Sequence, residues 1–223
     1  PIWKPYLADV LTFAESEPVE LLLEEDLVGN PRICDRAHMT SPGRILHAWM
    51  LLRYLSYRRI NAYDPTISRI IEFGGGFGGL ASIWHRLRRR DLTYVIFDTP
   101  IMATIQWHYL SAVLGPDSVV AVTLPSHPVL PGRINILPVS MLPRRDIVGD
   151  LFISTWALSE SNKTAQMAVA DSGWFGARGL LLAYQGSCAA FPYAEDLRDE
   201  VDRRGGEVFQ MPYDFAHKYC AFV

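Results

Sequence analysis

The sequence predicts an α/β fold: a mostly parallel β-sheet with an antiparallel last strand, preceded by a helical N-terminal cap. From residue 66 onward, short apolar runs alternate with segments of helical periodicity, which is the pattern of β-α-β crossovers. The closing stretch, 207–223, holds two apolar segments around Pro212 with too little chain between them for a helical crossover, so it predicts an antiparallel pair. The first 65 residues show helical patterns only. We therefore predict a cap over 1–65 and one α/β domain over 66–223.

Two helices are predicted in the cap. The Leu- and Glu-rich segment 18–28 is closed by Gly29 and Asn30, a combination that ends helices. Ser41 and Pro42 supply an N-cap and a first-turn proline. Apolar residues then recur at steps of three and four positions, so this second helix should run to about Arg59.

The α/β part follows from its apolar runs. Strands are expected at 67–73, 94–97, 119–122, 134–139, 151–153 and 179–183, and helices at 80–90, 101–114, 165–170 and 195–204. A proline-rich loop spans 125–131.

Composition narrows the function classes. The 223 residues are 49% apolar and 20% charged, which is typical of one globular unit. The net charge is 21 − 24 = −3, so we expect neither a nucleic-acid nor a membrane partner, and no apolar run approaches the roughly 18 residues of a membrane helix. Cys34, Cys188 and Cys220 lie far apart, and residues 1–9 lack a secretion-signal pattern. These features predict a cytoplasmic protein.

A glycine-rich turn at 72–79, Glu-Phe-Gly-Gly-Gly-Phe-Gly-Gly, should connect the first strand to the next helix. Two ligand classes fit it. Gly74, Gly76 and Gly79 satisfy the dinucleotide pattern G-x-G-x-x-G, and Asp98 lies 98 − 76 = 22 positions past its middle glycine, where a ribose-binding acid belongs. Read with Glu72 and Gly78, the same turn satisfies E-x-G-x-G-x-G, the first motif of class I S-adenosylmethionine-dependent methyltransferases.

Three features favour the methyltransferase. A carboxylate two residues before the turn would repel a pyrophosphate but attract a sulfonium and an amino group. The cap is too short for the second substrate domain of a nicotinamide enzyme, and the strand-Pro-strand ending resembles the antiparallel last strand of class I methyltransferases. An NAD(P)-dependent oxidoreductase and a non-catalytic cofactor-binding partner subunit remain as alternatives.

The segments 71–79, 96–100, 136–138 and 153–160 (IEFGGGFGG, IFDTP, ILP and ISTWALSE) carry a resemblance. From about Thr40 onward the chain resembles the sugar O-methyltransferases, a class I family with a Rossmann-like fold. The resemblance implies methyl transfer from S-adenosylmethionine to a hydroxyl of a sugar or glycoside. A mannoside of a polymethylated polysaccharide is one candidate, and the acceptor would be a small molecule or an oligosaccharide.

The resemblance also implies site residues. Asp98 should bond the ribose hydroxyls, the glycine turn should hold the methionine part, and the loop after 134–139 should flank adenine. The expected cofactor-binding set is Glu72, Gly74, Gly75, Gly76, Gly78, Asp98, Thr99, Ser140 and Thr155. We add Arg44, on the helix before the turn, as a partner for the cofactor carboxylate.

A sugar hydroxyl is a weak nucleophile, so a general base or a metal ion should assist it. Glu160, just past a strand end, is the first candidate for the base, and His217 is the second. Glu160 could equally be an acid favoured by a helix N-terminus. Glu160, Asp214 and His217 together could hold Mg²⁺. Sugar contacts are expected from Trp156, His127 and Tyr193, and a homodimer is one expected assembly.

Overall fold

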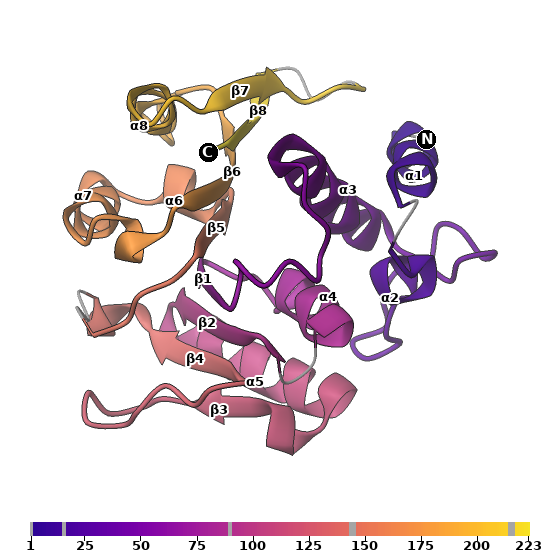
Figure 1. Ribbon diagram of the computed structural model, residues 1–223, viewed down its shortest axis with the longest axis horizontal. Coiled ribbons are helices and arrows are strands. Elements are labelled where there is room, and N and C mark those ends of the chain that lie inside the picture. Colours follow the sequence, from indigo (N-terminus) through magenta and orange to yellow (C-terminus); the bar gives the residue numbers. More distant parts are fainter. Residues whose placement is uncertain (1, 15–16, 89–90, 143–145, 214–216) are drawn as a thin grey trace.

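An eight-stranded sheet lies between two layers of helices (Figure 1). The computed structural model describes residues 2–14, 17–88, 91–142, 146–213 and 217–223. The strand order is β3-β4-β2-β1-β5-β6-β8-β7. The strands are β1 (Arg69–Phe73), β2 (Thr93–Asp98), β3 (Val119–Ala121), β4 (Ile134–Pro138), β5 (Leu151–Thr155), β6 (Gly179–Gln185), β7 (Glu207–Gln210) and β8 (Lys218–Phe222).

The predicted sheet type is confirmed. Strands β1 to β6 pair in parallel, whereas β8 runs antiparallel to both β6 and β7. In the register of β1 and β2, Phe73 lies opposite Phe97. The glycine turn after β1 and Asp98 at the end of β2 are therefore adjacent at the carboxyl edge of the sheet, where ligands of open α/β sheets bind.

Each helical layer covers one face of the sheet (Figure 1). Ile70 and Tyr94 point into the core under the first layer, and their chain neighbours Ile71 and Val95 point into the other core, as the two-residue period of a strand requires. The first layer consists of α1 (Trp3–Phe13), α2 (Val19–Leu23), α3 (Pro42–Arg58), α4 (Gly79–Arg88) and α5 (Pro100–Leu114). The second consists of α6 (Ala157–Glu160), α7 (Lys163–Asp171) and α8 (Asp196–Arg203), and short 3₁₀ turns lie at η2 (Pro116–Ser118), η3 (Val139–Met141) and η4 (Trp174–Gly176).

The start of α3 is as predicted. Ser41 accepts a hydrogen bond from the Arg44 backbone amide at 3.2 Å, and Pro42 occupies the first turn. The helix predicted over 18–28 is wrong in extent, because α2 ends at Leu23. Beyond it, the Glu25 amide donates to the Met39 carbonyl and the Glu25 carboxylate accepts from Ser41, so tertiary bonds hold this backbone away from a helix.

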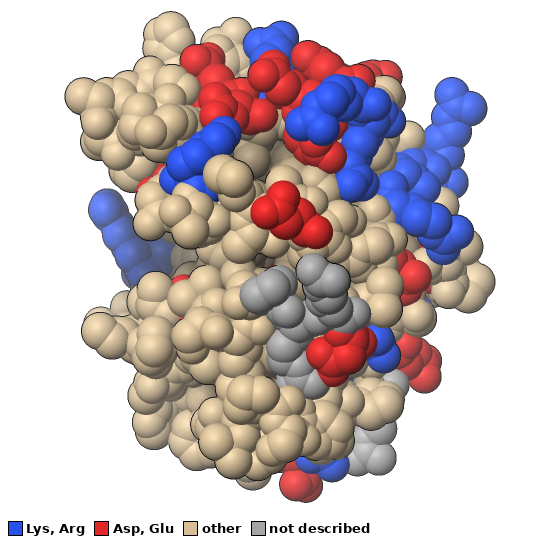
Figure 2. All heavy atoms as spheres, turned by 90° about the vertical axis from the view of Figure 1, so that its left-hand side faces the viewer, with Lys and Arg blue, Asp and Glu red and all other residues tan. Residues whose placement is uncertain are grey.

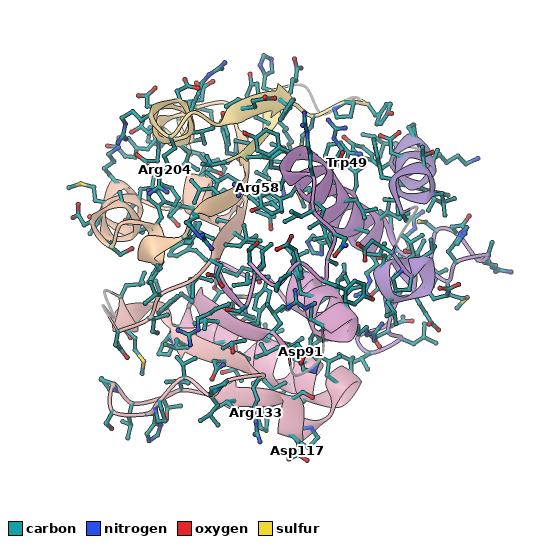
Figure 3. The ribbon with its side chains drawn as sticks, viewed as in Figure 1. Trp49, Arg58, Asp91, Asp117, Arg133 and Arg204 are labelled. Carbon is teal, nitrogen blue, oxygen red and sulfur yellow. The ribbon has the colours of Figure 1, made fainter. Side chains whose placement is uncertain are left out.

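The cap shares its core with the sheet. Tyr6, Leu22 and Trp49 from the cap belong to the same buried cluster as Ile70 and Leu151 from β1 and β5. The indole nitrogen of Trp49 also donates to Asp9 on α1 at 3.0 Å, and Figure 3 shows this side chain between α3 and α1. Helices α1–α3 are therefore fixed over the sheet. Within the described ranges, no helix has both the length and the apolar character to cross a membrane.

Candidate functional site

The glycine turn brings three elements into contact. Gly74, Gly76 and Gly78 have φ values of +75°, +56° and +98°, a region that side-chain-bearing residues avoid. A Cβ on Gly74 would lie 2.0 Å from the Cβ of Ala157, and one on Gly78 would lie 2.8 Å from Leu110. The turn therefore lies against both α6 and α5, with no room for larger residues at these two positions.

Asp98 lies beside this turn and is held from two sides. Its Oδ1 accepts from the Thr99 amide at 2.7 Å, and its Oδ2 accepts from Gln106 Nε2 at 2.6 Å. Gln106 Nε2 also donates to the Gly76 carbonyl at 2.9 Å. Burial raises the pKa of Asp98, and the hydrogen bonds from Thr99, Gln106 and the Gly75 amide oppose that rise. One buried amide thus joins the acid to the turn.

The sequence argument did not identify Gln106. Gln106 is fully buried on α5, a helix rich in apolar residues. The only hint in the sequence is a long amide side chain within this mostly apolar helix. The Oε1 of Gln106 is buried without a hydrogen-bond partner among the described residues. An orphaned buried acceptor beside an acid and a glycine turn is the kind of group that a polar ligand satisfies.

Glu72 lies beneath the turn and is buried. Tyr94 donates a hydrogen bond to its Oε2 at 3.0 Å, and burial raises its pKa to about 8. At pH 7 the protonated, neutral form of this carboxyl therefore predominates. The structure corrects the electrostatic argument made from the sequence, since Glu72 supports the turn from below and exposes no carboxylate charge to a ligand.

Arg44 is also corrected. Its guanidinium donates to the carbonyls of Leu22 and Leu21 at 2.8 and 3.0 Å and to Ser82 Oγ at 2.8 Å, and its side chain is buried. These bonds tie α2 to α4. They leave Arg44 a structural role in place of the predicted pairing with a cofactor carboxylate.

His47, one turn further along α3, reaches the glycine turn instead. A Cβ on Gly79 would lie 3.0 Å from its Nδ1, and that nitrogen is buried with no hydrogen-bond partner in the part of the chain that the structure describes. Burial is the main cause that lowers the pKa of His47 to about 4, and Arg44 adds to it, so the ring is neutral at pH 7. His47 therefore brings a second unsatisfied polar atom to the turn.

Three further residues that were predicted to bind the cofactor lie in the segments that follow strands. Thr99 is the exposed N-cap of α5, where its side chain accepts from the Met102 amide at 3.4 Å. Ser140 is exposed in η3, directly after β4, and Thr155 is half-buried at the end of β5. All three lie at the carboxyl edge of the sheet.

A second group of side chains gathers where β5 and β6 end. Trp156 follows β5 with φ 77° and ψ −46°, a strained conformation for a side-chain-bearing residue. Its amide donates to the Ala183 carbonyl at 2.8 Å, and Ser159 on α6 donates to Gln185 at 3.3 Å. The turn after β5 is thereby fixed against the end of β6.

The start of β8 completes this group. The His217 carbonyl accepts from the Gly186 amide at 2.7 Å, and Lys218 Nζ lies 4.8 Å from the centre of the Trp156 ring. Lys218 was not singled out from the sequence, although it follows His217 directly. Glu160 is exposed at the end of α6, and His217 is exposed as well. The structure thus places both predicted bases around the end of β6.

No metal site is established. The described residues contain no group of three His, Cys, Asp or Glu side chains placed to hold a metal ion. Asp214, the third member of the predicted triad, lies outside the described residues.

The other predicted sugar contacts are spread apart. Tyr193 lies beside α7, with Lys163 Nζ 5.5 Å from its ring centre. His127 is exposed in the loop after β3, at the far edge of the sheet. With strands roughly 4.8 Å apart, the four steps from β5 to β3 span roughly 19 Å. The structure therefore does not bring His127 to Trp156.

The carboxyl edge is uneven in charge. Figure 2 views the molecule from the side where the loops after β3 and β4 lie; acids and bases are dense at the height of α8 and sparse at the height of β4 and β3. The loop residues 122–131 include no Asp, Glu, Lys or Arg. Among the described residues, this half of the edge thus carries few charged side chains.

The opposite edge holds a separate charged cavity. Asp91, Asp117 and Arg133 (Figure 3) line a volume of about 1000 Å³ where β2, β3 and β4 begin. Ligands of open α/β sheets bind at the carboxyl ends of strands, so the candidate site is the other edge.

The comparisons with known proteins define the fold. No protein-family model matches the sequence, and no curated protein matches it. Among solved structures, the methyltransferase domain of a bacterial Hen1 superposes with a TM-score of 0.50 at 10% identity, covering 77% of this chain and 94% of that one. Magnesium protoporphyrin IX methyltransferase from Synechocystis PCC 6803, with bound SAH, gives 0.50 at 11% identity, covering 80% and 83%. The fold is therefore the Rossmann-like fold of class I S-adenosylmethionine-dependent methyltransferases.

Proposed function

We propose that this protein is an S-adenosylmethionine-dependent O-methyltransferase. The observation that carries the proposal is the link from Asp98 through Gln106 to the glycine turn, at adjacent strand ends of a class I methyltransferase fold. A buried acid joined to a positive-φ turn suits a ribose diol and the amino-acid part of one ligand. The orphaned Gln106 Oε1 and His47 Nδ1 support a polar ligand there.

In this proposal different residues of the chain bind different parts of the cofactor. Asp98 accepts hydrogen bonds from the ribose hydroxyls of S-adenosylmethionine, and the backbone of the glycine turn binds its amino-acid part. The segment around Ser140 flanks its adenine ring. Glu72 and Gln106 hold the turn and the acid in place. Positioning of this kind supplies much of the catalysis in a displacement that forms no covalent enzyme intermediate.

S-adenosylmethionine supplies a sulfonium-bound methyl group: the acceptor oxygen bonds to the methyl carbon, the carbon–sulfur bond breaks, its electrons stay on sulfur, and the hydroxyl proton leaves. Glu160 accepts that proton, and His217 is the second candidate. Glu160 ends α6, just after β5, and the His217 carbonyl accepts from the Gly186 amide, just after β6. Trp156, half-buried beside Lys218, is the aromatic side chain that we assign to contact with the acceptor.

We propose a sugar or glycoside as the acceptor, on the sequence resemblance and on this aromatic side chain. A pyranose packs its apolar face on an indole ring, and exposed polar groups nearby can bond its hydroxyls. The neighbouring solved structures do not bear on this choice, because they are 10–11% identical to this chain and define only its fold.

The deciding experiment is calorimetric titration with S-adenosylhomocysteine and, separately, with NAD. We expect micromolar binding of the first, about −8 kcal/mol, and no heat from the second. Asp98→Asn should weaken S-adenosylhomocysteine binding by about tenfold or more, because an amide replaces one acceptor with a donor. Asp117→Asn, at the opposite edge, is the matched control. Binding of NAD instead would select the oxidoreductase.

A further inference from the structure

An apolar cavity opens on the outer side of the glycine turn. It has a volume of about 690 Å³, within the roughly 300–1,000 Å³ typical of small-molecule sites. Its walls come from the cap loop, the start of α3, the glycine turn and α5. The apolar lining residues are Val28, Pro31, Pro42, Phe77, Ile105 and Tyr109.

This lining is open to solvent. Val28 and Ile105 are each 44% exposed and Phe77 is 40% exposed, although all three are large apolar side chains. Contiguous exposed apolar surface of this kind marks a binding site in a soluble protein. Helix α5 is apolar on nearly every side, and its core-facing side is already filled by residues such as Leu110. Its outward apolar face therefore has no partner among the described residues.

The cavity shares a wall with the proposed cofactor site. Phe77 belongs to the glycine turn and packs edge-to-face on Tyr109, with ring centres 4.9 Å apart. Its ring would also touch a Cβ on Gly79, at 2.9 Å, beside the orphaned His47 nitrogen. A molecule in the cavity would contact the turn itself.

Five polar side chains also line the cavity. The Glu25 carboxylate accepts from Ser41 at the start of α3, Arg32 lies on the cap loop, and Thr104 and His108 lie on α5 one turn apart. A mostly apolar body with a small number of polar groups matches this lining better than a bare sugar does, because a sugar would leave its hydroxyls unpaired against Phe77, Ile105 and Val28.

We propose that this cavity binds the apolar part of the acceptor, an aryl or alkyl aglycone attached to the sugar that is methylated. That the ligand carries a sugar rests on the proposed function, whereas the binding of an apolar group rests on the cavity alone. The proposal predicts that glycosides with an apolar aglycone bind better than free sugars.

The test uses the whole chain and a neutral probe, N-phenyl-1-naphthylamine, which fluoresces in apolar sites. We expect saturable binding that Ile105→Asp weakens by about tenfold or more, since an apolar ligand in the cavity would have to desolvate the new carboxylate. Ile101→Asp is the matched control. Ile101 lies one turn earlier on α5, is 75% exposed and does not line the cavity, so binding should stay within about twofold. Thr104→Trp, which fills the cavity without adding charge, should also weaken binding.

Competition then identifies the ligand. 4-Nitrophenyl and octyl glycosides should displace the probe, and the free sugars should not. Absence of saturable probe binding, equal effects of the Ile105 and Ile101 variants, or displacement by free sugars as effective as by glycosides would each overturn the proposal. S-adenosylhomocysteine titration of the same samples keeps the two proposals apart. If wild type fails that titration, the methyltransferase proposal fails while the probe result still decides the cavity.

Discussion

The two halves of the carboxyl edge are built differently. Around β1 and β2, the polar groups are buried and bonded to one another: Asp98 to Gln106, Gln106 to the turn, and Glu72 to Tyr94. Around β5 and β6, Glu160 and His217 are exposed, and Trp156 holds a strained backbone. One half therefore consists of buried polar groups that are bonded to one another, and the other presents exposed polar side chains. In the proposed function the first half binds the donor and the second binds the acceptor.

The largest effect, on the free energy of unfolding, should come from adding a methyl group where the glycine turn packs against α6. Gly74→Ala would force a Cβ to within 2.0 Å of Ala157 at a positive φ, so we expect a loss of about 3 kcal/mol or more in the free energy of unfolding. Chemical denaturation measures it. Gly173→Ala, also at positive φ but with nothing within 4 Å, should cost only about 1 kcal/mol. Equal costs would show that the close approach to α6 contributes nothing.

Glu160→Gln tests the open half. We expect kcat to fall by about 10²-fold or more, because the acceptor hydroxyl loses its base, while S-adenosylhomocysteine binds as before. Glu207→Gln, an exposed glutamate on β7, is the control and should keep full turnover. If Glu160→Gln retains turnover and His217→Ala loses it, the base is His217. If EDTA abolishes turnover, a metal ion replaces the base.

Gln106→Leu tests the organised half without touching the proposed ligand contacts of Asp98. Removing the amide frees Asp98 from the turn, so we expect about tenfold weaker S-adenosylhomocysteine binding by calorimetry. Gln166→Leu removes another buried amide, on α7, which donates to the carbonyls of Leu158 and Tyr193 in the other half. It should lower stability and leave this affinity unchanged. A matching loss of affinity would mean that the halves are not separable.

The smallest effect is a pH dependence from Glu72. Its pKa of about 8 lies above the unfolded value of 4.5, so the folded state holds an extra proton between these values and loses stability as the pH rises toward 8. From pH 6.5 to 8 this should amount to on the order of 1 kcal/mol in wild type. Glu72→Gln should remove it.

Between pH 6.5 and 8, the comparison of wild type with Glu72→Gln separates the contribution of Glu72 to stability from those of other titrating groups. His47, with a pKa lowered to about 4, binds a proton more readily when unfolded, so its contribution rises with pH mainly between about 4 and 7, and it is present in both proteins. Asp98, whose pKa is also raised, is present in both proteins and cancels in the difference. Parallel pH profiles for wild type and Glu72→Gln would contradict a buried protonated carboxyl.

The sequence by itself determined the layered α/β fold, the position of the glycine turn, and Asp98 at the end of the neighbouring strand. These follow from hydrophobic periodicity, from the glycines of the turn and from the succession of strands and helices along the chain, all of which are local properties of the sequence. It also determined the antiparallel pair at the end, since the short connection permits nothing else.

Only the tertiary structure decided which polar side chains are available. Arg44 and Glu72 have the residue types of ligand-binding groups, yet burial and long-range hydrogen bonds turn one into a tie between helices and the other into a neutral support. The roles of Gln106 and Lys218 and the cavity against Phe77 could not be derived from the sequence, because each depends on contacts between elements far apart along the chain. Burial and pairing are properties of packing, and packing is decided by the whole fold.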